Sequence, residues 1–490
     1  MQMPAIMGQS PYDVASDATA ASAPRAESDA HVAREWSPSR YNARARDERG
    51  HLILWNTLSG AISVFDEAQA RQVEPFLQKL GSTGPRLGVA GYLAERGFIV
   101  ERNDDEGQRM QFAFGKDHYR SDKLELILLA SEDCNFRCVY CYEAFARGTM
   151  LPHVRRGVLK LAEQRAPGLR QLQVGYFGGE PLYGLKAIEE MAPRFLQLSA
   201  EHELQFTSSM TTNGYLLVPE TATRLLDWNI RHFQITLDGL GEDHDRNRHG
   251  RDGQATFDRV YDNLRSLHER SDDFGVTLRV NFDQTNYPRL PDLLNAIQRD
   301  FGSDPRFVLS FSPVGKWGGP NDDSLNTCGA KETRQALVQL QRSTLERGLS
   351  VNMGIKDVAR PGTQICYAAR PYSLIIGADG KVMKCTVALD TNEQNIVGHL
   401  AEDGALTIDA RRFAFWTEPA FENDAECKSC WLSPGCGGMH CPWHRMLYNV
   451  RPCPSLKTNL RNELTNTVLR DSATARRIKV GGIPAAPLPK

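Results

Sequence analysis

The chain has 490 residues, too many for one ordinary hydrophobic core, so its length excludes a small peptide-like scaffold and predicts a barrel-sized domain with one or two smaller modules. Lys and Arg number 58 and Asp and Glu number 60, and the resulting formal charge of -2 gives no electrostatic reason for nucleic acid or an anionic membrane to be the main partner. No stretch approaches the unbroken apolar length that a membrane helix needs.

The first residues are rich in Ala, Ser, Asp and Pro, and they carry neither the basic nor the apolar region of a signal peptide. We therefore expect residues 1–39 to form a disordered tail and the protein to be cytoplasmic. The sequence contains 11 cysteines, and disulfides are rare in that reducing compartment. Ligation of metal ions or iron–sulfur clusters is the leading explanation for these thiols.

Residues 40–105 predict a small winged-helix-like module. Two strands around a tight turn come first, and two helices and a closing strand follow. We expect strands at 41–46 and 51–55 around a turn at 47–50, helices at 66–80 and 91–96, and the closing strand at 97–100.

Residues 120–355 alternate short apolar runs with amphipathic helical stretches, a pattern typical of parallel βα units. The six apolar runs lie at 124–130, 172–177, 204–210, 232–238, 276–282 and 307–312. Their spacing leaves no room for eight units. The sequence therefore predicts an α/β domain with an open, partial (β/α)6 barrel.

Three cysteines, Cys134, Cys138 and Cys141, follow the first apolar run directly. In a parallel barrel this loop lies on the face where active sites collect, so the three thiolates can converge on one metal centre. A structural zinc ion would need a fourth ligand, which Asp133 or Glu143 could supply only awkwardly. A four-iron cluster tolerates three cysteines and leaves one iron open for another ligand.

Polar groups recur at the ends of the later strands. A carboxylate in a Gly-Gly-Glu-Pro turn can accept hydrogen bonds from a ligand ammonium, and an arginine offers a paired donor fork to a ligand carboxylate. Simple turns and an ion pair inside the barrel are equally open explanations. The residues concerned are Gly178, Gly179, Glu180, Pro181, Asn213, Asp238 and Arg279.

The CxxxCxxC triad, with Tyr140 before its last cysteine and the Gly-Gly-Glu-Pro turn after the next strand, resembles the signature of the radical S-adenosylmethionine (SAM) superfamily. The resemblance implies that Cys134, Cys138 and Cys141 hold a [4Fe-4S] cluster and that SAM binds its open iron. It also implies that Tyr140 and the strand-end residues contact SAM. A 5'-deoxyadenosyl radical would then abstract hydrogen from a substrate.

Seven further cysteines occupy residues 356–465, and we expect residues 466–490 to form a tail. The cysteine pattern resembles the SPASM extension, which holds two auxiliary four-iron clusters, although the interval from Cys436 to Cys441 is one residue longer than usual. The resemblance assigns the first auxiliary cluster to Cys366, Cys385 and Cys441. It assigns the second to four cysteines, which makes three [4Fe-4S] clusters in all: Cys427, Cys430, Cys436 and Cys453.

One cysteine, Cys328, remains outside these sets, and it could complete the first auxiliary site or be a lone thiol. A zinc ribbon is the alternative for Cys427 to Cys441.

SPASM proteins act mostly on peptides, and the N-terminal module is similar to the leader-binding domains of enzymes that mature ribosomal peptides. In such domains a leader peptide adds a strand to an exposed sheet edge. Ile53, Trp55, Ile62 and Val64 could line the neighbouring groove or form the core of the module itself. A DNA-binding winged helix is the competing interpretation, and the absence of net positive charge argues against it.

The resemblance thus implies a radical SAM peptide maturase that receives electrons from a flavodoxin or ferredoxin. Thr386 follows Cys385 where sulfatase-maturing relatives carry an Asp, so formylglycine formation is disfavoured. We expect a carbon–carbon or carbon–heteroatom link within a precursor peptide, and the general base stays unassigned. An epimerase using Cys328 as hydrogen donor is the first alternative, and a zinc or iron–sulfur protein without catalytic activity is the second.

Overall fold

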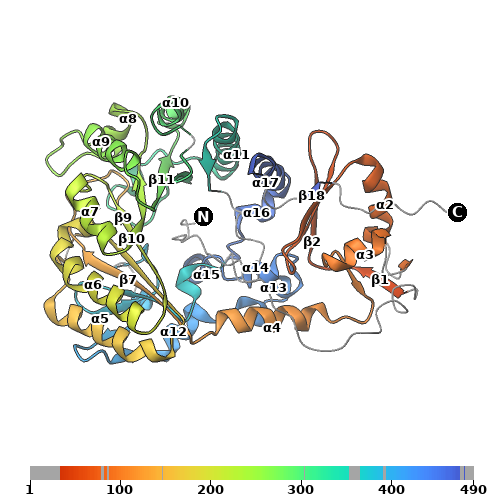
Figure 1. Ribbon diagram of the computed structural model, residues 1–490, viewed down its shortest axis with the longest axis horizontal. Helices are drawn as coiled ribbons and strands as arrows, with labels where there is room; N and C mark the ends of the chain where they lie inside the picture. Colours follow the sequence, from red (N-terminus) through yellow and green to blue (C-terminus); the bar gives the residue numbers. More distant parts are fainter. Residues whose placement is uncertain are drawn as a thin grey trace.

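The computed structural model describes residues 34–78, 82–84, 88–145, 147–302, 304–352, 365–389, 393–474 and 479–480. Figure 1 shows the barrel at the left and the N-terminal module at the right, with helix α4 (Glu106–His118) running between them. Within these residues, no helix combines the length and the apolar character that a membrane crossing requires.

Six adjacent parallel strands form the barrel, which confirms the predicted α/β class and all six apolar runs. Continuous apolar runs suit strands that are buried on both faces, and eight of the nine residues of β7 are buried. The strands are β7 (Lys123–Ser131), β8 (Gln171–Gly178), β9 (Gln205–Thr212), β10 (Ile230–Thr236), β11 (Gly275–Phe282) and β12 (Phe307–Pro313).

Amphipathic helices cover the outside of these strands (Figure 1). They are α5 (Pro152–Arg165), α6 (Leu185–Glu201), α7 (Pro219–Asp227), α8 (Glu242–Asn247), α9 (Phe257–His268), α10 (Leu290–Phe301) and α11 (Ala330–Glu346).

The barrel sheet continues beyond both of its expected edges. The short strand β13 (Ser350–Val351) pairs with β12, and β14 (Ser373–Ile376) lies parallel to β7 on the other side. Three antiparallel strands extend the sheet from β14: β15 (Lys381–Met383), β16 (Ile396–Leu400) and β17 (Leu406–Ile408). The cysteine-rich region therefore begins as part of the barrel sheet, which the sequence did not predict.

Short helices complete the cysteine-rich region. They are α12 (Ala410–Thr417), α13 (Ala425–Ser429), α14 (Ser433–Cys436), α15 (Pro442–Tyr448), α16 (Ser455–Thr458) and α17 (Leu460–Thr474).

The N-terminal module contains two small sheets. Strands β2 (Asn42–Arg46), β3 (Leu52–Asn56) and β4 (Ile62–Phe65) are antiparallel, as the hairpin pattern predicted for the first two. The second sheet contains β1 (Arg34–Pro38), β5 (Ser82–Gly84) and β6 (Ile99–Glu101). The two helices of the module are α2 (Glu67–Gln78) and α3 (Gly88–Glu95).

Two predicted tails need correction. Arg34–Pro38 is strand β1, so the expected tail 1–39 is wrong over its last residues, and residues 1–33 lie outside the described part of the chain. Helix α17 continues past residue 465, and β18 (Lys479–Val480) pairs in parallel with β4. Strands β1 and β18 pair with segments that are distant in sequence, and no local sequence pattern predicts such pairing.

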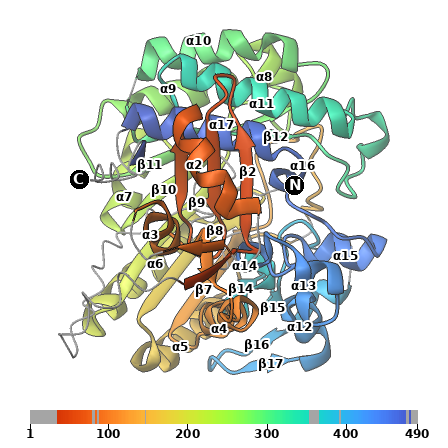
Figure 2. The same ribbon diagram turned by 90° about the vertical axis from the view of Figure 1, so that its right-hand side faces the viewer.

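The face of the β2–β4 sheet that was a candidate groove is covered. Ile53 and Trp55 are 0% exposed and Val64 is 4% exposed, and they pack with Leu432, Leu456, Leu464 and the partly buried Ile62 in one cluster. Helix α17 crosses behind this sheet (Figure 2). The opposite face packs on α2 and α3. The four residues thus belong to an interface with the cysteine-rich region, and they do not line an open groove.

Candidate active site and cysteine clusters

The loop that carries Cys134, Cys138 and Cys141 leaves the carboxyl end of β7 and pairs with a distant segment. Val139 N donates to Asn247 O at 2.9 Å, and Arg137 N donates to His249 O at 3.0 Å. The segment after α8 therefore pairs with the cysteine loop through backbone hydrogen bonds, as a short antiparallel strand would. Sequence reasoning missed this role, and its only signal was the polar run from 244 to 253.

The three thiols of this loop lie within electrostatic reach of one another. Burial raises the pKa of the Cys134 thiol, and Glu180, Cys138 and Cys141 raise it further. Burial also raises the pKa of Cys141 to about 12, with a further increase from Cys138. Phe136 N lies 3.3 Å from Cys134 Sγ. Grouped thiols in such surroundings favour a bound cation that replaces their protons, so the donor set fits an iron–sulfur cluster.

The glycines of the Gly-Gly-Glu-Pro turn are required by close backbone packing. Gly178 has φ of +124°, and an added Cβ would lie 2.2 Å from Ser131 O. The same addition at Gly179 would place Cβ 2.6 Å from Asp133 O. The turn therefore lies directly against the backbone that precedes Cys134, and Pro181 begins a short 3-10 helix.

The Glu180 carboxylate connects the ends of β8 and β9. It is 0% exposed and accepts hydrogen bonds from Leu182 N, Thr212 Oγ1 and Asn213 N at 3.0, 2.8 and 2.8 Å. Asn213 in turn donates to Asn135 Oδ1 at 2.7 Å. The structure thus brings Glu180 and Asn213 together beside the cysteine loop, with both side chains engaged in the protein.

A buried polar network joins Tyr140 to the ends of β10 and β11. The Tyr140 hydroxyl donates to Asp238 and accepts from Arg248 Nη1 and Asn281 Nδ2, both at 2.9 Å. Asp238 is 0% exposed and also accepts from Asn281 N at 3.2 Å. Burial raises the pKa of Asp238, and the nearby Arg248 guanidinium opposes that rise.

Arg279 and Arg248 play different parts around this network. Arg279 Nε donates to Asn281 Oδ1 at 2.8 Å, and it forms no ion pair with any residue that the structure describes. The guanidinium group of Arg279 thus retains N–H donors for a further acceptor. Arg248 is 7% exposed and was not predicted, because it comes from the segment that pairs with the cysteine loop.

The first predicted auxiliary set, Cys366, Cys385 and Cys441, also comes together. Burial raises the pKa of Cys385 to about 11, and Cys441 adds to the rise. Both Cys385 and Cys441 raise the pKa of Cys366 in the same way. Cys366 N donates to Met439 O at 3.1 Å, which connects two strongly separated parts of the chain.

Two further residues shape this set, and sequence reasoning named only one of them. Asn395 is 0% exposed, and it accepts from Cys385 N and donates to Cys385 O, both at 2.8 Å. Thr386 is 2% exposed, and its hydroxyl lies 2.7 Å from the Tyr367 hydroxyl. The Thr386 hydroxyl is thus buried and engaged with another side chain of the protein.

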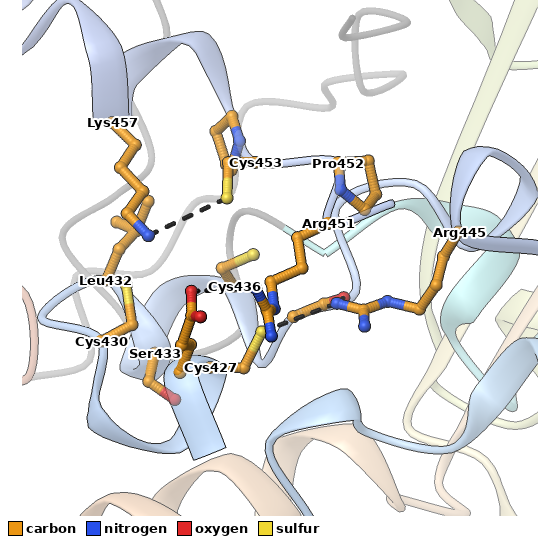
Figure 3. A pocket seen from close by; sticks show the side chains of 13 residues that line it. Cys427, Cys430, Leu432, Ser433, Cys436, Arg445, Arg451, Pro452, Cys453 and Lys457 are labelled. Carbon is orange, nitrogen blue, oxygen red and sulfur yellow. Dashed lines mark hydrogen bonds and ion pairs between the residues drawn. The ribbon is translucent and has the colours of Figure 1, made fainter. Parts of the chain in front are cut away.

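The second predicted auxiliary set surrounds a single cavity, shown in Figure 3. The cavity opens to solvent, and about 420 Å³ of space between atoms, part of it open solvent, lies within and in front of it. The lining thiols are Cys427, Cys430, Cys436 and Cys453. Four convergent thiols around a cavity fit a four-iron cluster. Within the described chain, no three His, Cys, Asp or Glu side chains are arranged to hold a single metal ion.

Cys328 lies apart from both auxiliary sets. It precedes α11, and burial raises its pKa, with further increases from Glu332 and Asp283. No other cysteine contributes to this rise in the pKa of Cys328. The structure therefore does not bring Cys328 to Cys366, Cys385 and Cys441.

Comparison with known proteins gives matches over parts of the chain. Residues 128–297 match the family described as the radical SAM superfamily. GTP 3',8-cyclase of Nostoc punctiforme is 32% identical over 157 residues, which are 30% of this chain and 44% of that protein. Radical SAM cyclopropyl synthase TigE of Paramaledivibacter caminithermalis is 22% identical over 378 residues, 70% of this chain and 74% of that protein. The chain spans about half the length of the GTP 3',8-cyclases that it matches.

A solved structure, native anSMEcpe with bound AdoMet and Cp18Cys peptide, has the same fold with a TM-score of 0.52. It is 17% identical in sequence, and the match covers 72% of this chain and 99% of that one.

Proposed function

The chain belongs to the radical SAM superfamily, and on that premise we propose that it is a peptide maturase that links two positions of one precursor peptide. The observation that carries the proposal is the grouping of ten cysteines into three sets, one beside the barrel and two in the C-terminal region. The cyclopropyl synthase name of one relative and the peptide bound in anSMEcpe are further support.

The proposed chemistry starts at the cysteine loop. When bound by Cys134, Cys138 and Cys141, a four-iron cluster with SAM supplies a 5'-deoxyadenosyl radical that removes a hydrogen atom from the substrate. The chain itself orients these groups and excludes water. The segment after α8 fixes the loop, and the Tyr140 network fixes the ends of β10 and β11 beside it.

SAM contacts are assigned to the polar strand ends. Arg279 keeps guanidinium donors and would bind the SAM carboxylate. The backbone of the Gly178–Pro181 turn and the side chains of Tyr140, Glu180, Asn213 and Asp238 would border SAM, because all of them lie around the cysteine loop.

A link within a peptide requires the loss of two hydrogens. One would leave as a hydrogen atom taken by the radical, and the second would leave as a proton, with an auxiliary cluster as the acceptor of its electron. Cys366, Cys385 and Cys441 would hold the first auxiliary cluster, and the cavity thiols would hold the second. A flavodoxin or ferredoxin would exchange electrons with the enzyme, one at a time.

Epimerisation is the second candidate, and one observation favours it. Besides burial, the Asp283 carboxylate raises the pKa of the Cys328 thiol. Asp283 directly follows the carboxyl end of β11, and the cysteine loop leaves the same end of the barrel. A thiol on this face could return a hydrogen atom to a peptide radical. A Cys328→Ala variant would then lose turnover, whereas a link-forming enzyme would keep it.

The test combines iron analysis, SAM cleavage and mass spectrometry. After anaerobic reconstitution we expect about twelve irons per chain, four for each of three clusters, and production of 5'-deoxyadenosine. A co-expressed precursor peptide should lose about 2 Da per link, the mass of two hydrogens lost to the radical and the cluster. Unchanged mass with deuterium taken from solvent would establish epimerisation, and stoichiometric zinc without SAM cleavage would establish the non-catalytic alternative.

The N-terminal module is proposed to bind the leader of that peptide at the β4 edge. Both faces of the β2–β4 sheet are covered, so an added strand must pair along an edge. In this structure β18 occupies the β4 edge. A leader would therefore take the place of β18 there.

A further inference from the structure

The cavity of the second auxiliary set is bordered by cationic side chains that point at its sulfurs (Figure 3). Arg445 Nη2 lies 3.5 Å from Cys427 Sγ, and Lys457 Nζ lies 3.9 Å from Cys453 Sγ. Cys430 lines the same cavity within electrostatic reach of Lys457. Each of the two cations thus contacts one of the four thiols.

The Arg445 side chain is held in place by Asp424. Asp424 Oδ2 accepts from Arg445 Nη1 at 3.3 Å and from Arg451 Nε at 2.7 Å. The other oxygen of Asp424 accepts from Cys427 N at 3.2 Å and so caps α13. The carboxylate therefore connects the arginine to the segment that carries its sulfur partner.

Lys457 is positioned by the backbone next to its sulfur. Helix α16 begins at Ser455, and Lys457 N donates to Pro454 O at 2.9 Å, directly after Cys453. Its contact with Cys453 is thus between neighbours in sequence, and Cys430 lines the same cavity.

Cations also lie within electrostatic reach of the other two cysteine sets, Arg248 near Cys138 and Arg370 near Cys366, but they form no such hydrogen bond to a sulfur among the described residues. Among the described residues, no Lys or Arg side chain donates a hydrogen bond to the sulfur of Cys134, Cys138, Cys141, Cys366, Cys385 or Cys441. Hydrogen bonds to cluster sulfurs and nearby positive charge favour the reduced state, because reduction adds one negative charge to the cluster.

We propose that Arg445 and Lys457 make the cluster at Cys427, Cys430, Cys436 and Cys453 easier to reduce than it would be without these two cations. The inference rests on the cluster assignment of the proposed function. One electron converts the cluster from its 2+ to its 1+ state, with no bond made or broken. Arg445 and Lys457 act as positioning residues that stabilise the added charge.

A redox titration followed by electron paramagnetic resonance tests this on the reconstituted full-length protein, with dithionite as reductant. Lys457→Gln and Arg445→Gln should each lower the midpoint potential of one cluster and leave the other two unchanged. Lys457→Arg keeps a charged donor and should restore the wild-type potential. The matched control is Lys428→Gln, which removes an exposed charge next to Cys427; within the described part of the chain, the Lys428 side chain donates no hydrogen bond to a sulfur.

Three outcomes would overturn the proposal. The first is an unmoved potential in both glutamine variants with full iron content, and the second is an equal shift in Lys428→Gln. If Arg445→Gln loses four irons because Asp424 is released, Lys457→Gln decides alone. The third outcome, loss of four irons in both variants, would give the cations a role in holding the cluster instead of tuning it.

The titration uses no peptide, so its result is separable from the reaction. A protein that binds about twelve irons but links no peptide would contradict the proposed function and leave this inference standing. A protein that binds no cluster at the cavity would remove the basis of both.

Discussion

Tyr140 is the residue through which the cysteine loop contacts the polar ends of β10 and β11. Its hydroxyl donates to one buried carboxylate and accepts from Arg248 and Asn281. Networks of this kind stabilise a site when every member is satisfied, and removing one member leaves the others buried without partners.

Tyr140→Phe should therefore lower the stability of the protein by about 1–3 kcal/mol, because Asp238 and Arg248 each lose a hydrogen bond in a buried place. SAM cleavage should fall as well. Thermal unfolding and 5'-deoxyadenosine production measure the two effects. Tyr183→Phe is the control, since Tyr183 is 43% exposed, and a loss of equal size there would contradict the role given to the network.

Arg248 shows why part of this site could not be predicted. Cysteine spacing and strand-end positions predicted Tyr140, Asp238 and Arg279, because each of them follows from local sequence. Arg248 reaches the network only because residues 247–251 pair with the cysteine loop. That pairing joins segments about a hundred residues apart, and neither segment carries a strand pattern.

The turn after α14 explains the long interval between Cys436 and Cys441. Gly437 and Gly438 have φ of +56° and +75°, values that few other residues adopt. An added Cβ at Gly438 would lie 3.0 Å from Cys427 Sγ and 2.7 Å from Ala420 Cβ. The turn thus lets Cys436 face the second cavity while Cys441 joins Cys366 and Cys385.

Gly438→Ala should reduce the iron content by about four per chain, because the new methyl group displaces Cys427. Gly348→Ala is the matched control. Gly348 has φ of +74° and no atom within 4 Å of an added Cβ, so it carries the same backbone strain without the clash. Equal iron loss in both variants would show that strain alone is responsible.

Helix α17 buries an acidic residue, Glu463, which is 5% exposed. Burial raises its pKa to about 7, from an ordinary value of 4.5. Between these values the folded protein keeps a proton that the unfolded chain has lost. The free energy of unfolding should therefore fall as pH rises from about 4.5 to about 7, by up to about 3 kcal/mol.

Glu463→Gln should remove this pH dependence. The melting temperature of the variant should exceed that of the wild type at pH 8, and the difference should shrink at pH 5. Glu422→Gln changes an exposed carboxylate and serves as control. A wild type that becomes more stable from pH 5 to pH 8 relative to Glu463→Gln would contradict the assignment.

The helices and strands differ in how well the sequence predicts them. Strand β7 was predictable because a strand that is buried on both faces requires a long apolar run. Strand β11 was predictable because buried residues alternate with partly buried ones along most of its length. Strands β1 and β18 were missed because they are short and pair with residues far away in the chain. The same reason applies to β14, whose partner β7 lies about 250 residues earlier.

At the scale of the whole molecule, the N-terminal module is joined to the second cysteine set. Trp55 packs edge-on against Trp431 at 5.7 Å between ring centroids, and the Thr57 hydroxyl donates to Trp431 O. Trp431 directly follows Cys430. The predicted groove on this face is therefore part of the contact that holds the module to the cluster region, and peptide capture must use an edge of the sheet.

The β4 edge and its present occupant lead to the last prediction. Lys479 and Val480 pair with Ser63 and Val64 in parallel, so the C-terminal strand and a leader would compete for one set of backbone groups. Val480→Pro removes a backbone N–H and disfavours the strand. If the leader uses this edge, the variant should bind a fluorescent leader peptide more tightly than the wild type by about 3- to 10-fold, on the order of 1 kcal/mol.

Deletion of residues 40–105 and a proline inside β4 complete this experiment. Ser63→Pro should abolish leader binding, because it disrupts the edge itself, while SAM cleavage without peptide should persist at the distant barrel. Leader affinity that is unchanged in the truncated protein would reject the module as the binding site. Weaker binding in Val480→Pro would instead show that β18 supports the leader site, and it would place the leader on a different edge of the module.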